Sequence, residues 1–81
     1  MRFTDERVEM SRALASEVQS TAQDALAHSP IGALRGLRVE QVDDALLLIG
    51  SVRTYYHKQL AQEAVRALDR NVRIINSIDV S

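Results

Sequence analysis

Cysteine is missing from this sequence of 81 residues, and histidine occurs only twice. Without cysteine the chain has neither a disulfide nor a thiolate ligand, and two histidines offer few nitrogen ligands for a metal ion. We therefore expect no metal site and no cofactor. The lack of cysteine also leaves the redox compartment open, because such a chain suits the cytoplasm and the periplasm alike.

Long hydrophobic runs are also scarce. The longest apolar block is Ala45–Ile49, which is far shorter than the roughly 20 residues of a membrane-spanning helix. The first turns contain Asp5, Glu6 and Glu9, so the chain lacks the apolar segment of a signal peptide. We expect a cytoplasmic protein if this is the full chain, and a periplasmic or envelope protein if it is part of a longer exported one.

The balance of charges is close to neutral. The formal net charge is −1, and the isoelectric point is about 6.1, so the chain lacks the basic surplus typical of nucleic-acid-binding proteins. Hydrophobic residues make up 46% of the sequence and charged residues 26%, as in ordinary soluble domains. A chain of this length buries one small core, which predicts a single domain.

The first third of the sequence has helical periodicity. Between residues 4 and 27, small and aliphatic residues recur about every 3.6 positions. The inward residues predicted for this helix are Leu14, Ala15, Val18, Ala22, Ala25 and Leu26. Pro30 should end the helix near His28, because the residue before a proline avoids helical angles. We interpret His28 as a solvated residue at the negative pole of the helix, not as a ligand, and residues 31–36 as a flexible connection.

Two strands and a tight turn are predicted next. Residues 37–42 alternate between apolar and polar side chains, and Asp43-Asp44 is typical of a turn. Residues 45–52 are apolar at nearly every position, so both faces of this strand carry aliphatic side chains. Leu47 and Ile49 should lie on the face opposite the core. The residues predicted to point inward from the two strands are Leu37, Val39, Leu46, Leu48 and Val52.

A second helix and a last strand complete the pattern. Gly50 predicts a bulge or the close approach of another backbone, and Thr54 is a suitable N-cap for a helix over residues 55–68. Its apolar stripe consists of Leu60, Ala61, Ala64 and Leu68. Residues 72–80 predict a strand, in which Asn76 interrupts an apolar row. We expect the Asn76 side chain to bond neighbouring backbone where the strand bends.

The order helix, strand, strand, helix, strand predicts an α+β fold. A hairpin, a crossover helix and a third strand give a two-layer sandwich, with a three-stranded mixed sheet and the helices on one face. The crossover connection sets the third strand parallel to the second. The sequence leaves open whether the third strand pairs beside the first strand or beside the second.

From Val18 to Val80 the chain resembles a BON domain, the small module named for bacterial OsmY and nodulation proteins. The family pattern is a helix with spaced aliphatics, a strand I-x-V, an apolar strand ending in G-x-V, a helix that begins with Ser or Thr, and a closing V-x-N-x-I-x-V. The matching residues are Val18, Ala22, Leu26, Leu37-Arg38-Val39, Leu46, Leu48, Gly50-Ser51-Val52, Thr54, Ala61, Ala64, Ile74, Asn76, Ile78 and Val80.

The chain departs from this pattern in two places. It has Asp44 where the family commonly has a hairpin glycine, and Arg70-Asn71 where the family commonly has a glycine before the last strand. Aspartate and asparagine tolerate similar backbone angles, so the same fold is expected. The resemblance divides the chain into an N-terminal extension or helix start, residues 1–16, and a BON-like domain, residues 17–81.

The resemblance implies a non-enzymatic binding module of the kind found in bacterial cell-envelope and stress-response proteins. Such a module contacts a phospholipid membrane surface or another protein, and the family has no residue motif that assigns the contact site. From the residues themselves we predict a contact patch formed by Leu47, Ile49, Tyr55 and Tyr56. A local basic patch is predicted from Arg35, Arg38, Arg53 and Lys58. A net charge of −1 offers little general attraction to anionic headgroups.

The sequence also bears on three other functions. A KH-like nucleic-acid-binding module needs a Gly-x-x-Gly loop between two helices, and the sequence has none. A purely structural oligomerisation domain, in which the chain forms a homo-oligomer, fits the same apolar strand. An enzyme is disfavoured because Asp43 and Asp44 are typical solvated turn residues, with no pair of base and nucleophile in the sequence. Two carboxylates also supply few of the roughly six oxygens that a hard cation needs.

Overall fold

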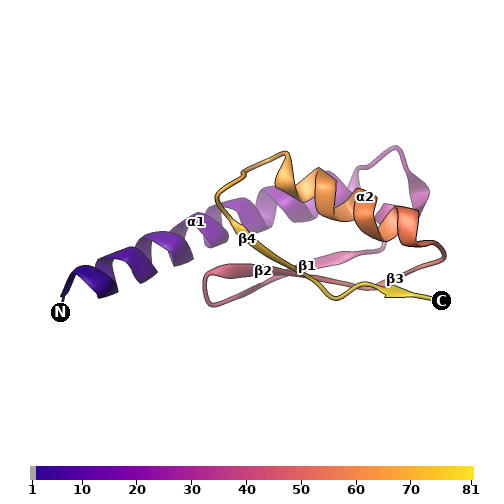
Figure 1. Ribbon diagram of the computed structural model, residues 1–81. Helices are drawn as coiled ribbons and strands as arrows, with labels where there is room; N and C mark the ends of the chain where they lie inside the picture. Colours follow the sequence, from indigo (N-terminus) through magenta and orange to yellow (C-terminus); the bar gives the residue numbers. More distant parts are fainter. Residues whose placement is uncertain (1) are drawn as a thin grey trace.

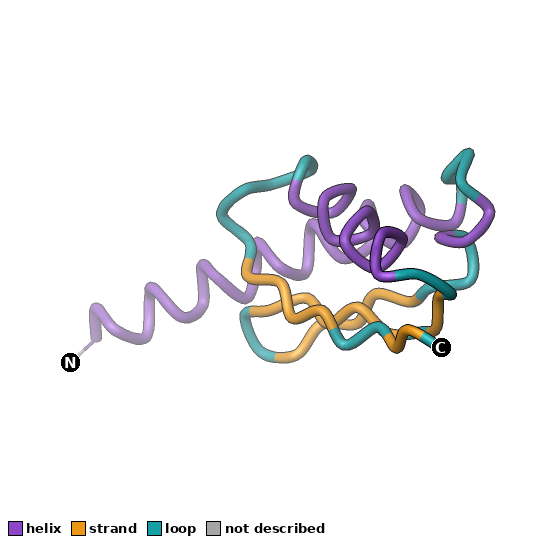
Figure 2. The backbone as a smooth tube through the Cα atoms, turned by 45° about the vertical axis from the view of Figure 1, so that its right-hand side comes forward, coloured by secondary structure: helices purple, strands orange, loops and turns teal. Residues whose placement is uncertain are grey.

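The computed structural model describes the backbone of residues 2–81 and the side chains of residues 9–81. The chain forms helix α1 (Arg2–Ala27), the short 3-10 helix η1 (Gly32–Leu34), strands β1 (Arg38–Val42), β2 (Ala45–Ile49) and β3 (Ser51–Val52), helix α2 (Tyr55–Arg66), and strands β4 (Arg73–Asn76) and β5 (Asp79–Val80). Both helices lie on the same side of the strands, so the domain has one helix layer and one strand layer (Figures 1 and 2).

Strand β2 is the centre of a three-stranded sheet with the order β1-β2-β4. Strand β1 pairs with β2 antiparallel, and β4 pairs with β2 parallel. The α+β prediction is therefore confirmed, and the position of the last strand, which the sequence left open, is beside β2. Strands β3 and β5 continue β2 and β4 as a short parallel pair, so each of the two long strands expected from the sequence is interrupted once.

The interruption of the central strand occurs at Gly50. Its φ angle is +140°, and a Cβ atom placed on this residue would lie 2.5 Å from Leu37 Cδ2 and 3.4 Å from Leu37 Cα. The expectation of a close backbone approach is therefore confirmed, since the chain just before β1 packs against the main chain of Gly50. Glycine is required here both for the backbone angle and for the space.

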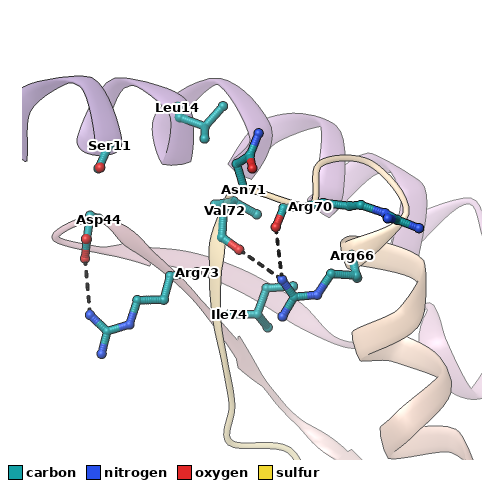
Figure 3. Close-up of a pocket in the computed structure, with 9 residues that line it drawn as sticks. All are labelled: Ser11, Leu14, Asp44, Arg66, Arg70, Asn71, Val72, Arg73 and Ile74. Atoms are coloured by element: carbon teal, nitrogen blue, oxygen red, sulfur yellow. Dashed lines mark hydrogen bonds and ion pairs between the residues drawn. The ribbon is translucent and has the colours of Figure 1, made fainter. Parts of the chain in front are cut away.

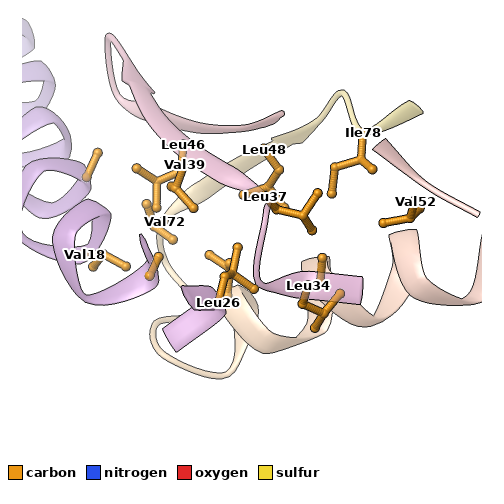
Figure 4. Close-up of a cluster of buried hydrophobic side chains, with 14 residues drawn as sticks. Val18, Leu26, Leu34, Leu37, Val39, Leu46, Leu48, Val52, Val72 and Ile78 are labelled. Carbon is orange, nitrogen blue, oxygen red and sulfur yellow. The ribbon is translucent and has the colours of Figure 1, made fainter. Parts of the chain in front are cut away.

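The core lies between the helix layer and the sheet. Its largest fully buried side chains are Leu26, Leu34, Leu37, Val39, Leu46, Leu48, Val65, Val72 and Ile78, most of which are labelled in Figure 4. Leu34 comes from η1, so the segment expected as a flexible connection instead contributes to the core. Val65 takes the buried position expected for Leu68, which is 41% exposed because α2 ends at Arg66. Ala25, also expected inward, is exposed.

The end of α1 and the beginning of α2 follow from the residues at those positions. Helix α1 ends at Ala27, as Pro30 predicts, and His28 Nδ1 lies 2.9 Å from the carbonyl oxygen of Asp24. The helix is unbroken across residues 16 and 17, where the sequence suggested a change from extension to domain, and its first turns project beyond the sheet (Figure 1). Helix α2 has the predicted N-cap, since Thr54 Oγ1 accepts a hydrogen bond from the backbone N–H of His57 at 3.1 Å.

Glutamine side chains attach α1 to the outer edge of β1. Gln23 Nε2 donates to the carbonyl oxygen of Leu37 at 3.0 Å, while Gln23 Oε1 accepts from the N–H of Val39 at 2.8 Å. Gln19 Nε2 donates to the carbonyl oxygen of Val39 at 2.8 Å. At Leu37 and Val39 these contacts replace the hydrogen bonds that another strand would make, so this part of the outer edge is closed from within the chain.

Asn76 marks the bend between β4 and β5. Its Oδ1 accepts from the N–H of Ile78 at 3.2 Å, which confirms the expected bond to neighbouring backbone. Its Nδ2 also donates to the carbonyl oxygen of Lys58 at 3.0 Å and to Gln62 Oε1 at 3.1 Å. A single half-buried amide thus joins the bend of the strand to helix α2, a role that the local sequence did not reveal.

The hairpin turn between β1 and β2 has its strained residue at Asp43, where φ is +56°. We expect Asp43→Gly to raise the free energy of unfolding by about 0.5–1 kcal/mol, because glycine adopts positive φ without steric cost. The ion pair lost with Arg12, 3.9 Å away between exposed side chains, contributes little.

The matched control for this turn is Asp44→Gly, at the position where the BON pattern commonly has glycine. Asp44 has no positive φ, so glycine there should lower stability by increasing the entropy of the unfolded chain. Urea unfolding of both variants measures the difference. A greater gain for Asp44→Gly than for Asp43→Gly would contradict the assignment of the strained position.

Candidate functional site

The side of the sheet opposite the helices is the candidate site, and we call it the open face. The pairing register places one set of side chains on this side, because residues opposite each other in paired strands point the same way. Glu40 pairs with Leu47, and Leu47 pairs with Ile75 across β2 and β4. The open face comprises Arg38, Glu40, Val42, Ala45, Leu47, Ile49, Arg73 and Ile75.

The centre of the open face is apolar. Leu47 and Ile49 on β2 are half-buried, whereas Ile75 on β4 is 39% exposed and Val42 on β1 is 44% exposed. These side chains come from all three strands, and the helices pack on the other side of the sheet (Figure 1). The result is a small accessible apolar surface on the side of the sheet that the helices leave uncovered.

Charged side chains border this apolar centre and are paired with one another. Arg38 Nη2 lies 3.2 Å from Glu40 Oε2, and Arg73 Nη1 lies 3.7 Å from Asp44 Oδ1. Both arginine side chains are largely exposed. Because each cation has an anionic neighbour, the open face has a mixed border instead of a strong field of one sign.

The predicted contact patch is only partly brought together. Leu47 and Ile49 lie on the open face, as expected. Tyr55 and Tyr56 lie in the first turn of α2, in the helix layer, where they are 64% and 67% exposed. The ring centroid of Tyr56 is 5.5 Å from that of His57, with the planes tilted by 59°. The tyrosines and the aliphatic pair therefore belong to different layers of the domain.

The residues of the predicted basic patch are likewise distributed over several elements. Arg38 lies on the open face, whereas Lys58 lies on α2 and Arg53 lies in the connection between β3 and α2. The guanidinium of Arg35 is bound to its own loop, where Nε donates to the carbonyl oxygen of Ser29 at 2.7 Å. The structure does not bring Arg38 and Lys58 to the same side of the sheet.

A cavity of about 350 Å³ lies between α1 and the connection from α2 to β4 (Figure 3). Its lining residues are Ser11, Leu14, Asp44, Arg66, Arg70, Asn71, Val72, Arg73 and Ile74. Arg66 Nη1 donates to the carbonyl oxygens of Arg70 and Val72, at 3.3 and 3.4 Å, and Arg73 is paired with Asp44. Two of the three arginines are thus engaged within the chain, and Arg70 points away from the cavity in Figure 3.

Among the residues that the structure describes, no three histidine, aspartate or glutamate side chains gather closely enough to hold a metal ion. Within the same residues, no helix has both the length and the apolarity needed to cross a membrane.

Sequence reasoning missed two residues of the open face, Val42 and Ile75. Alternation along each strand was a usable signal for both. Val42 lies two and four positions after Glu40 and Arg38 and therefore shares their face, whereas Ile75 lies on the opposite face from its neighbour Ile74. What the alternation did not show was that β4 lies beside β2, which places Ile75 next to Leu47. The cluster therefore depends on strand order, which pairwise spacing in the sequence does not specify.

Comparison with known proteins adds no relative to this description. No family model, no curated protein and no solved structure matches the chain. The fold and the open face define a two-layer α+β domain with an accessible apolar sheet surface, and the resemblance to BON domains stays a prediction from the sequence.

Proposed function

We propose that the chain is a non-enzymatic interaction module of the BON type, and that the open face is its contact surface. The observation that carries this proposal is the apolar centre formed by Leu47, Ile49 and Ile75 on the side of the sheet that faces away from both helices. Complete burial of an exposed aliphatic side chain releases about 1.5–3 kcal/mol, and the gain is smaller for Leu47 and Ile49, which are already half-buried in the chain. The resemblance supports a phospholipid surface or a cell-envelope protein as the partner.

The charges of the open face bear on the choice between these partners. Membrane-binding surfaces usually present clustered lysine and arginine to anionic headgroups. Here Arg38 and Arg73 have anionic neighbours, at 3.2 and 3.7 Å. We therefore favour a protein partner that contacts the apolar centre directly, with paired charges at the rim that orient the contact and exclude water.

Site-specific photo-crosslinking distinguishes the two partners. A photoreactive phenylalanine analogue in place of Ile49 is expected to give a discrete adduct in living bacterial cells, and the mass of the adduct identifies a protein or a lipid. The control carries the same analogue in place of Leu68, which is 41% exposed but belongs to the helix side of the domain. Equal labelling at the two positions would argue against the open face as the contact surface.

A charge placed at the centre of the open face should weaken the contact. We expect Leu47→Asp to reduce adduct formation at a neighbouring open-face position by roughly tenfold or more, because the remaining burial of Leu47 is lost and the new carboxylate would have to be removed from water. Leu68→Asp is the matched control and should leave adduct formation unchanged. Thermal unfolding of both variants shows whether the fold is kept, and binding that survives in a folded Leu47→Asp protein would contradict the proposal.

Sedimentation with vesicles tests the lipid outcome separately. Vesicles of phosphatidylcholine, with and without phosphatidylglycerol, are mixed with the wild-type chain at low and moderate salt. Pelleting that Leu47→Asp abolishes and Leu68→Asp does not would assign the open face to a membrane surface. If the chain pellets with neither kind of vesicle, the protein partner is retained and the lipid partner is rejected.

A further inference from the structure

The two outer edges of the three-stranded sheet differ in how they are protected. The edge of β1 is closed at Leu37 and Val39 by Gln19 and Gln23 of α1. Strand β4 forms the opposite edge, and in Figures 1 and 2 it lies in front of the other strands, with α2 above it and no further strand alongside. An unprotected edge is a surface on which another strand can add by main-chain hydrogen bonds.

The direction of the backbone groups along this edge follows from the bonds on its inner side. The N–H groups of Ser77, Asp79 and Ser81 donate to β2, Gly50 and β3, at 3.0, 2.9 and 2.9 Å. Successive residues in a strand direct their backbone groups to opposite sides. The odd-numbered residues therefore bond inward, and the backbone groups of Val72, Ile74, Asn76 and Ile78 point outward.

Two of these outward groups already have partners within the chain. The carbonyl oxygen of Val72 accepts from Arg66 Nη1 at 3.4 Å, and the N–H of Ile78 donates to Asn76 Oδ1 at 3.2 Å. The segment between these two blocked groups is 74–76, in which Ile74 and Asn76 have outward backbone groups and Ile75 bonds inward. Val72 and Ile78 lie three positions before and three positions after Ile75, so the open segment is symmetric about that residue.

We propose that β4 is the interface for a second copy of this chain, which adds antiparallel with Ile75 at the two-fold axis. In this register Ile74 of each copy lies opposite Asn76 of the other, and the N–H and C=O groups of these residues form a ladder of hydrogen bonds. The blocked groups of Val72 and Ile78 lie opposite each other at both ends of the ladder. The two sheets then join in the strand order β1-β2-β4-β4-β2-β1.

The side chains in this register favour a second copy over an unrelated strand. Ile75 meets Ile75 of the second copy on the open face, so the two apolar centres become continuous. Arg73 lies opposite Ser77 of the second copy, which avoids a pairing of like charges. A register shifted by two residues would have Ile74 at the axis and would put Arg73 opposite Ile75. It would also put Val72 opposite Asn76, so the blocked carbonyl of Val72 would meet the unblocked N–H of Asn76.

Cysteine cross-linking tests the two-fold axis directly, because the chain has no cysteine of its own. Residues in a non-hydrogen-bonded antiparallel pair have Cα atoms about 4.5 Å apart, within the range of about 4.4–6.8 Å that a disulfide spans. Under mild oxidation, Ile75→Cys is therefore expected to form a covalent dimer on the order of ten times faster than a surface cysteine that meets the cysteine of a second copy only by diffusion. Val42→Cys is the control, since Val42 is 44% exposed on the same face but lies on β1.

Equal cross-linking of Ile75→Cys and Val42→Cys, or faster cross-linking of Val42→Cys, would overturn the proposal. Faster cross-linking at Val42 would indicate instead that two copies meet through their open faces. Circular dichroism shows whether each variant is folded. Ile75 and Val42 lie on the same face, so the comparison of their cross-linking reports on the β4 edge. The adduct at Ile49 reports on contact of the open face with another molecule, and the two proposals can therefore fail separately.

Amide hydrogen exchange of the wild-type chain provides a second measurement that needs no substitution. As the protein concentration rises, we expect the amides of Ile74 and Asn76 to become protected together with a dimer in analytical ultracentrifugation. The amides of Ile75 and Ser77 bond inward and should be protected at every concentration. A chain that stays monomeric throughout, or a dimer in which Ile74 and Asn76 exchange as fast as in the monomer, would overturn the proposal.

Discussion

Replacement of Gly50 with alanine is expected to lower the free energy of unfolding by about 2–4 kcal/mol, because the new side chain combines an unfavourable backbone angle with overpacking. The φ angle of +140° suits glycine, and the added Cβ would lie 2.5 Å from Leu37 Cδ2 and 3.4 Å from Leu37 Cα. The Leu37 methyl group can rotate away, but the backbone contact remains. For a domain of this size, with a total stability of roughly 4–12 kcal/mol, the loss is severe.

Gly36→Ala is the matched control for this prediction. Gly36 has no heavy atom within 4 Å of the position of its missing Cβ, and its φ is not positive. We expect this variant to be neutral or slightly more stable, by up to about 1 kcal/mol, because alanine restricts the unfolded chain. Urea unfolding of the two variants measures the difference. Similar midpoints for Gly50→Ala and Gly36→Ala would mean that the chain before β1 does not approach Gly50 as described.

Replacement of Gln23 with alanine is expected to remove about 2–3 kcal/mol of stability, since two backbone groups lose their partners at once. The Gln23 amide donates to the carbonyl oxygen of Leu37 and accepts from the N–H of Val39, at 3.0 and 2.8 Å. The effect should also be local, because the amide of Val39 becomes free to exchange with solvent. Hydrogen exchange of Val39 and urea unfolding together check the prediction.

Two further variants separate the hydrogen bonds from helix propensity. Asp24→Ala changes the next residue of α1, whose side chain is exposed, and should alter stability by less than about 0.5 kcal/mol. Gln23→Glu keeps an acceptor for the N–H of Val39 but places a carboxylate beside the carbonyl oxygen of Leu37. It should therefore resemble Gln23→Ala in stability while Val39 stays more protected. Unchanged protection of Val39 in Gln23→Ala would contradict the edge-closing role of this side chain.

The parts of the fold that depend on local chemistry were predictable from the sequence. Alternation placed Leu46 and Leu48 in the core and Leu47 on the other face, and both core leucines are fully buried. Thr54 and Pro30 marked the beginning of α2 and the end of α1. These signals act over a few residues, so neighbouring side chains and backbone angles are sufficient to specify them.

The parts that depend on contacts between distant residues were not predictable. Strand order decides that Ile75 joins Leu47 on the open face, and it results from packing of the whole chain. The pairing of Gln23 with β1 joins residues 14 and 16 positions apart, and no spacing rule connects them. The positive φ of the hairpin belongs to Asp43, one residue before Asp44, where the BON pattern commonly has glycine.

The amide of Asn76 has a consequence for how the domain meets a partner. It holds the bend after β4 through Ile78 and holds α2 through Lys58 and Gln62, at 3.2, 3.0 and 3.1 Å. Straightening the strand at this point would break the bond between Asn76 and Ile78, and the two bonds to α2 hold the amide in place. Strand β4 is therefore preorganised before any encounter, and little conformational entropy is left to lose when a second molecule adds to it.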